Sequence, residues 1–147
     1  MAQIAETTTI ARSPEQVWAV LADFGSIAEW APNVDHSCLT TELQQAVGST
    51  RRVQVGRNAL LEQVVEWEAG HRLAYTIEGL PPVIRSVTNS WQLEAVGPAT
   101  AVTITSVVNA GPRPPQQLVA RAVGKVLAKA SREMLDGLAN HLEERAA

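Results

Sequence analysis

The chain of 147 residues has a single cysteine, Cys38, so it cannot form an internal disulfide. A lone cysteine fits a reducing compartment, and we expect Cys38 to be a small buried apolar residue. The first residues lack the basic segment and apolar run of a secretory signal, and no apolar run approaches the roughly 18 residues of a membrane span. These absences predict a cytoplasmic protein without a membrane span.

The sequence lacks the residue motifs of several common classes of active site. The three histidines, His36, His71 and His141, are isolated from one another and form no cluster with Cys38, so no metal site is predicted. No glycine-rich phosphate loop and no G-x-S-x-G motif occurs, so we expect no cofactor. The 12 basic and 15 acidic residues leave a net charge of −3, which argues against nucleic acid as a partner.

What the chain does contain is typical of a globular domain. Hydrophobic residues make up 46% and charged residues 18% of the sequence, a balance that excludes disorder. A chain of this length buries roughly two-thirds of its unfolded surface, which is sufficient for one core. We expect a single domain over residues 1–147, while nothing in the sequence indicates an oligomeric state.

The first thirty residues predict a strand and two short helices. Residues 3–11 alternate and are rich in threonine, as strands are. A helix begins at Ser13-Pro14-Glu15-Gln16, with Ser13 as N-cap and Gln16 completing a capping box, and we expect it to end at Gly25. Residues 26–30 form a second short helix before Pro32.

Strand patterns fill the middle of the chain, over residues 34–40, 50–56, 60–68, 72–78, 85–96 and 99–109. Because no helix separates them, these strands must pair as an antiparallel meander. A long helix follows over residues 116–145, and its apolar stripe consists of Val119, Val123, Val126, Leu127, Ala130, Met134, Leu138 and Leu142. The predicted fold class is α+β: a seven-stranded curved antiparallel sheet wrapped around the long C-terminal helix.

Alternation along the strands predicts which side chains face that helix. The clearest inward set is Arg51, Val53, Val55, Leu73, Tyr75, Ile77, Val87, Asn89, Trp91 and Leu93. Tyr75 and Asn89, with His36 two residues after Val34, are polar groups that could orient a ligand inside an apolar shell. Hydrogen bonds to neighbouring backbone are the alternative. In residues 60–68 and 99–109 the inward face stays open, because both parities contain apolar residues.

The order of these elements resembles the START/Bet v 1-like (SRPBCC) superfamily, whose members have the helix-grip fold. Within it, the chain is similar over nearly its whole length to bacterial polyketide cyclase/dehydrase-like proteins. The matching motifs are Ser13-Pro14-Glu15-Gln16-Val17-Trp18, Trp30-Ala31-Pro32-Asn33-Val34, Gly48-Ser49-Thr50-Arg51 and Leu61-Glu62-Gln63-Val64. The resemblance implies a cavity between the sheet and the C-terminal helix that takes lipids, polyketides or other apolar molecules.

The same resemblance implies that Glu62 rather than Gln63 points inward, and that the loops at residues 56–59 and 79–82 flank the cavity mouth. A small hydrophobic ligand is the expected partner. The residues that we expect to bind it are Trp30, Val34, His36, Arg51, Val53, Val55, Glu62, Tyr75, Ile77, Val87, Asn89, Trp91, Leu127, Ala130 and Met134.

Three functions remain open on this evidence. The first is binding of a small hydrophobic or amphipathic ligand, such as a lipid or polyketide. The second is a polyketide cyclase/aromatase or dehydratase, with Glu62 or His36 as the catalytic acid/base and Arg51 or Tyr75 steadying an oxyanion. The third is a surface interaction module that uses the basic helix face formed by Arg121, Lys125, Lys129 and Arg132.

Overall fold

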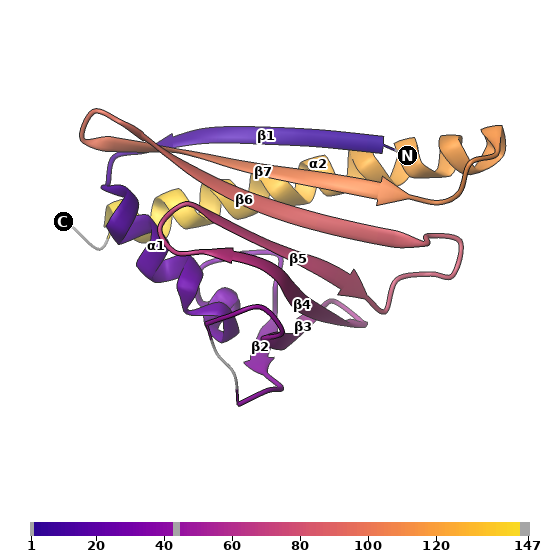
Figure 1. Ribbon diagram of the computed structural model, residues 1–147, viewed down its shortest axis with the longest axis horizontal. Coiled ribbons are helices and arrows are strands. Elements are labelled where there is room, and N and C mark those ends of the chain that lie inside the picture. Colours follow the sequence, from indigo (N-terminus) through magenta and orange to yellow (C-terminus); the bar gives the residue numbers. More distant parts are fainter. Residues whose placement is uncertain (1, 43–44, 145–147) are drawn as a thin grey trace.

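A computed structural model describes residues 2–42 and 45–144. Within them, seven strands form one antiparallel sheet in the order β1-β7-β6-β5-β4-β3-β2 (Figure 1). The elements follow the chain as β1 (Ala2–Ile10), α1 (Pro14–Ala22), the 3-10 helix η1 (Phe24–Glu29), β2 (His36–Leu39), β3 (Thr50–Val55), β4 (Asn58–Glu68), β5 (Arg72–Glu78), β6 (Ser86–Val96), β7 (Ala99–Asn109) and α2 (Pro114–Glu144). The predicted α+β fold class is confirmed.

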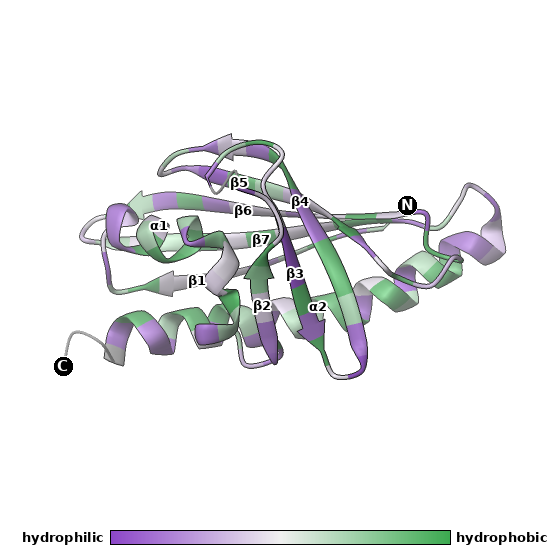
Figure 2. Cartoon of the chain, turned by 90° about the horizontal axis from the view of Figure 1, so that it is seen from below, coloured by the Kyte–Doolittle hydropathy of each residue, from purple (hydrophilic) through white to green (hydrophobic). Residues whose placement is uncertain are grey.

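Helix α2 lies against β1 and β7, and its hydrophobic and hydrophilic residues alternate in bands along its length (Figure 2). It begins at Pro114, two residues earlier than predicted, because proline suits the first turn of a helix. The predicted last residue, Arg145, lies outside the described residues. Val126 of the predicted apolar stripe is 69% exposed. None of the described helices is long and apolar enough to cross a membrane.

The start of α1 follows the predicted capping box. The Ser13 hydroxyl accepts a hydrogen bond from the Gln16 backbone N–H, and the Ser13 backbone N–H donates to Gln16 Oε1 at 3.1 Å. The helix ends at Ala22 rather than at Gly25, which belongs to η1. A Cβ on Gly25 would lie 2.8 Å from Leu39 Cγ, so this glycine permits η1 to approach β2 closely.

A bulge in β4 explains why the inward face of this strand was ambiguous. Val64 pairs with Tyr75, but the next pair is Glu66 with Ala74, so Val65 is an extra residue. Glu62 and Val64 are therefore buried before the bulge, while beyond it Trp67 turns toward the core against Trp18. The even-numbered residues therefore face inward before the bulge, and the odd-numbered Trp67 faces inward after it.

Burial also identifies the inward face of β7, which the sequence had left open. Every second residue of β7 from Thr100 to Val108 is buried, so Val102, Ile104 and Ser106 face inward. Val107, on the other parity, is only partly buried.

Strand β2 corrects the prediction for His36. The strand begins only at His36, two residues later than expected, so the parity of Val34 does not continue into it. His36 pairs with Gln54, and side chains of directly opposed residues lie on the same face of a sheet. His36 and Cys38 consequently both point outward and are exposed. Ser37 points inward instead, and its hydroxyl donates to the Gly25 carbonyl oxygen at 2.8 Å.

Candidate functional site

A cavity of about 330 Å³ lies between the inner face of the sheet and α2. Strands β3 to β6, the loop after β5, the segment before β2 and the middle of α2 all contribute to it. The lining residues are Ile27, Asn33, Val34, Val53, Val55, Asn58, Leu60, Glu62, Tyr75, Ile77, Gly79, Leu80, Pro81, Asn89, Val126, Leu127, Ala130 and Met134. The volume lies within the range of small-molecule sites.

The cavity has a buried end with polar side chains and an open end. At the buried end, Glu62, Tyr75 and Asn89 are 7%, 1% and 3% exposed. The lining residues Asn58, Pro81 and Val126 are exposed, and they define the open end. Among the described residues that line the cavity, Glu62 carries the one charge. The site therefore offers a ligand an apolar passage that leads to a carboxylate.

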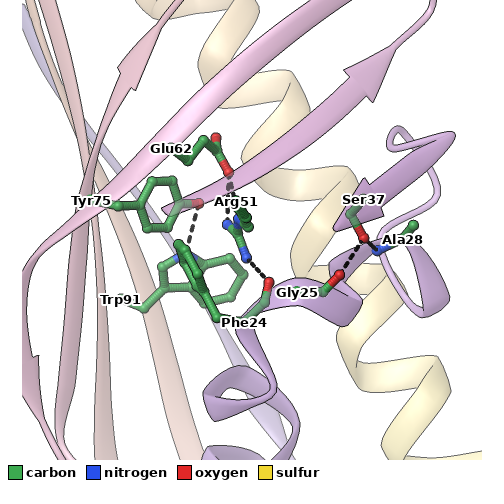
Figure 3. Close-up of polar contacts among 8 residues, drawn as sticks. All are labelled: Phe24, Gly25, Ala28, Ser37, Arg51, Glu62, Tyr75 and Trp91. Carbon is green, nitrogen blue, oxygen red and sulfur yellow. Dashed lines mark hydrogen bonds and ion pairs between the residues drawn. The ribbon is translucent and has the colours of Figure 1, made fainter. Parts of the chain in front are cut away.

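Arg51 and Glu62 form a buried ion pair beside the cavity (Figure 3). The two residues are direct cross-strand partners in β3 and β4, so the sheet register places both on the inner face. Arg51 Nε donates to Glu62 Oε1 at 2.8 Å, and Arg51 Nη2 lies 2.8 Å from the same oxygen. Figure 3 shows the other Glu62 oxygen pointing away from the guanidinium.

The rest of the guanidinium is enclosed by other parts of the chain. Arg51 Nη1 donates to the Phe24 carbonyl oxygen at 2.9 Å. Its Cζ lies 3.8 Å from the centre of the Phe24 ring and 4.7 Å from that of Tyr75, which are cation–π distances. The arginine side chain is 3% exposed. Its charge is therefore neutralised within the fold.

Tyr75 belongs to a row of polar side chains that crosses the sheet. Tyr75 pairs with Asn89, and Asn89 pairs with Ser106, so all three lie side by side on the inner face. The Ser106 hydroxyl donates to Asn89 Oδ1 at 2.6 Å, and Trp91 Nε1 donates to the Tyr75 hydroxyl at 3.2 Å. These bonds satisfy polar groups that would otherwise be costly to bury.

The Tyr75 phenol is held in its neutral form. Burial raises the pKa of Tyr75 above its ordinary value of 10.0, and the neighbouring Glu62 carboxylate raises it further. The charge of Arg51 and hydrogen bonds with Trp91 and Asn89 act in the opposite direction without outweighing burial. Tyr75 therefore stays a hydroxyl group at neutral pH.

The structure brings ten of the predicted ligand-binding residues together at the cavity: Val34, Val53, Val55, Glu62, Tyr75, Ile77, Asn89, Leu127, Ala130 and Met134. The other five lie elsewhere. His36 is on the outer face, and Val87 packs in a separate small core with Val108, Ala110 and Ala120. Neither residue lines the cavity.

Trp30, Arg51 and Trp91 are buried but do not line the cavity. The rings of Trp30 and Trp91 meet edge to face, with centres 5.7 Å apart. With Arg51 and Tyr75 they surround a void of only about 10 Å³, which is near the lower limit for one water molecule. These side chains fill the core, because Trp30, which follows η1, packs against Trp91, and Phe24 of η1 packs against Arg51.

Sequence reasoning missed several lining residues. Ile27, Asn33 and Leu60 line the cavity, and so does Val126, which was predicted only as a member of the apolar stripe of the helix. Leu60 has the same parity as Glu62, so the inward direction of Glu62 was the signal that could have identified it. Asn33 lies in an irregular segment, where alternation provides no signal; its Oδ1 is buried and has no hydrogen-bond partner among the described residues.

The basic face of α2 is mostly solvated. Arg121, Lys125 and Lys129 are exposed. Arg132 instead contacts its own chain: it donates to the Thr7 carbonyl oxygen at 3.2 Å and lies 3.6 Å from Asp136 Oδ1. Among the described residues, no group of three or more His, Cys, Asp and Glu side chains is arranged to hold a metal ion.

Comparisons with known proteins fit this geometry. Residues 1–143 match the family model described as polyketide cyclase/dehydrase and lipid transport. Among curated proteins none matches the chain significantly. Similar solved structures include the Zhui aromatase/cyclase from Streptomyces sp. R1128, with a TM-score of 0.82, 19% identity, and coverage of 99% of this chain and 96% of that one.

Two further structures represent other branches of the fold. A START superfamily protein from Mycobacterium smegmatis has a TM-score of 0.74 and 14% identity, covering 97% of both chains. Ara h 8.0201 has a TM-score of 0.75 and 14% identity, covering 97% of this chain and 98% of its own. At these identities the likeness concerns the helix-grip fold alone. The family match, which spans nearly the whole chain, shows that this protein belongs to the polyketide cyclase/dehydrase and lipid transport family.

Proposed function

We propose that the protein binds a small hydrophobic or amphipathic ligand in the cavity between the sheet and α2. The observation that carries this proposal is the cavity itself, about 330 Å³ in volume and lined mainly by apolar side chains. Burial of a ligand's apolar surface there favours binding by a free energy of roughly 25 cal/mol per Å² of buried area. Family membership supports the same function, since its description includes lipid transport.

The first test is native and denaturing mass spectrometry of the freshly purified protein, in search of a co-purified small molecule. Calorimetric titration with 2-methoxynaphthalene, an uncharged apolar probe, then measures binding directly. We expect Ala130→Trp, which places an indole in the cavity lining, to lower the affinity at least about tenfold.

The matched control is Ala122→Trp, an exposed position on the same helix with a similar helix-propensity change. We expect this variant to bind the probe as the wild type does. Absence of a co-purified molecule together with no binding of the probe would overturn the proposal. Equal binding by Ala130→Trp and wild type would place the ligand elsewhere.

We propose catalysis as the second candidate, with Glu62 as a base that removes a proton next to a substrate carbonyl. Its support is that Glu62 lines the cavity while Arg51 holds only one of its oxygens. Since Arg51 does not line the cavity and each of its guanidinium nitrogens is engaged within the fold, the Tyr75 hydroxyl is the group that could steady the oxyanion. The exposed position of His36 excludes it from this role.

Proton exchange of 2-tetralone in deuterated buffer, followed by NMR, tests this candidate. If Glu62 is a base, the wild-type protein accelerates exchange of the protons beside the carbonyl, and Glu62→Gln abolishes the acceleration. Glu68→Gln, an exposed carboxylate later in β4, is the control and should exchange these protons at the wild-type rate. Exchange no faster than in buffer alone would contradict catalysis of this kind.

A further inference from the structure

We infer that the cavity selects an uncharged ligand with a hydroxyl group, an alcohol or a phenol, and that this hydroxyl donates a hydrogen bond to Glu62 at the buried end. The inference rests on the proposed ligand-binding function and adds a chemical class to it. It comes from the way in which the Arg51–Glu62 pair divides its hydrogen-bonding groups between the fold and the cavity.

The positive partner of the pair is not available to a ligand. All three guanidinium nitrogens are engaged, two with Glu62 Oε1 and one with the Phe24 carbonyl oxygen. The rings of Phe24 and Tyr75 pack against the guanidinium, and Arg51 is not among the residues that line the cavity. A carboxylate or phosphate group on a ligand would therefore meet no free cation there.

The negative partner, in contrast, reaches the cavity. Glu62 lines it and retains 9% of its side-chain exposure, and within the described residues the contacts between its carboxylate and Arg51 all involve Oε1. A carboxylate oxygen accepts hydrogen bonds only, and such charge-assisted bonds are about twice as strong as neutral ones. The buried end thus favours a donor and repels an anion.

The charge balance of the site favours a neutral donor over a cationic one. Arg51 already compensates Glu62, so an ammonium group would add an unpaired charge to a buried region, which carries a large desolvation penalty. A hydroxyl satisfies the free oxygen without adding charge. The apolar body of the ligand then extends past Ile77 and Leu127 toward Val126 at the open end.

Three naphthalenes of similar size separate these possibilities in calorimetric titrations at pH 7. We expect 2-naphthol, an uncharged donor, to bind at least about tenfold more tightly than 2-methoxynaphthalene, which cannot donate. We expect 2-naphthoate, an anion, to bind most weakly. Equal affinities for the three, or tightest binding of 2-naphthoate, would overturn the inference while leaving ligand binding intact; binding of none would overturn the proposed function as well.

Variants of the pair test the assignment to Glu62. In Glu62→Gln the carboxylate is lost and the Arg51 charge is uncompensated, so the affinity ratio of 2-naphthol to 2-naphthoate should fall at least about tenfold. Glu68→Gln should leave the ratio unchanged.

A double variant keeps the test valid if Glu62→Gln does not fold. Arg51→Met/Glu62→Met replaces both charges by apolar side chains of similar length, a change that buried ion pairs often tolerate. It should still bind 2-methoxynaphthalene but lose the preference for 2-naphthol. Retention of that preference would show that another group, and not Glu62, receives the hydroxyl.

Discussion

At the scale of single residues, the site depends on how one carboxylate is shared. Glu62 uses one oxygen to hold Arg51 within the fold, and its position at the cavity comes from its pairing with that arginine across the sheet. A buried charge without a partner would be strongly destabilising. The ion pair therefore lets the protein keep an acceptor inside an otherwise apolar space.

Tyr75 provides a spectroscopic prediction, because it is the one tyrosine in the sequence. Burial raises its pKa above 10.0, so the phenolate absorbance of the folded protein should appear only at a pH clearly above 10. The urea-unfolded chain is the control and should titrate near 10. A folded protein that titrates together with the unfolded chain would contradict the burial argument.

The same shift has a consequence for stability. Above pH 10 the unfolded chain loses the Tyr75 proton while the folded protein keeps it, so the free energy of unfolding decreases as the pH rises through this range. Below pH 10 both states are protonated and Tyr75 adds no slope. In urea denaturation, Tyr75→Phe should show a shallower decrease above pH 10 than the wild type.

Residue positions could be predicted only in part from the sequence. Alternation correctly placed Tyr75 and Asn89 on the inner face, but Val87 and Trp91 have the same parity and lie outside the cavity. Parity tells which face of a sheet a side chain occupies. Whether the space above it is open depends on how α2 and η1 pack, and that is decided by contacts far apart in the sequence.

At the scale of elements, two glycines of α2 predict opposite effects of the same substitution. A Cβ on Gly124 would have its nearest neighbours at 3.8 Å, which is ordinary contact. We expect Gly124→Ala to stabilise the protein by about 0.5–1 kcal/mol through helix propensity.

A Cβ on Gly137, in contrast, would lie 2.4 Å from the Trp30 carbonyl oxygen and 2.5 Å from Pro32 Cδ. We expect Gly137→Ala to destabilise the protein, because α2 would have to move away from the segment before β2. Urea denaturation of both variants measures the two signs. Stabilisation by both would show that α2 does not pack closely at Gly137.

The strands show where pattern reasoning reaches its limit. A bulge shifts the parity of β4 after Val64, and no turn residue marks it in the sequence. The position of β2 depends on its partner β3, since a four-residue edge strand has too few side chains to define its own face. Strands with regular alternation, such as β6, were predicted correctly along their length.

At the scale of the whole molecule, element order and hydrophobic pattern were sufficient for the fold. An uninterrupted series of strands followed by one amphipathic helix has few packing solutions, and the seven-stranded sheet around α2 is the one observed. The family follows from the match over residues 1–143. The cytoplasmic location stays a prediction from the sequence.

The position of β1 has a consequence for how the chain assembles. β1 is made before the other six strands of the sheet, yet its sheet partner is β7, and the hydrogen-bonded pair Thr7 and Thr103 are 96 residues apart in the chain. Closing so long a loop costs conformational entropy before any contact repays it, which slows folding. During synthesis, β1 must wait until β7 has been made, and until then its unpaired edge is a site where two unfinished chains could associate.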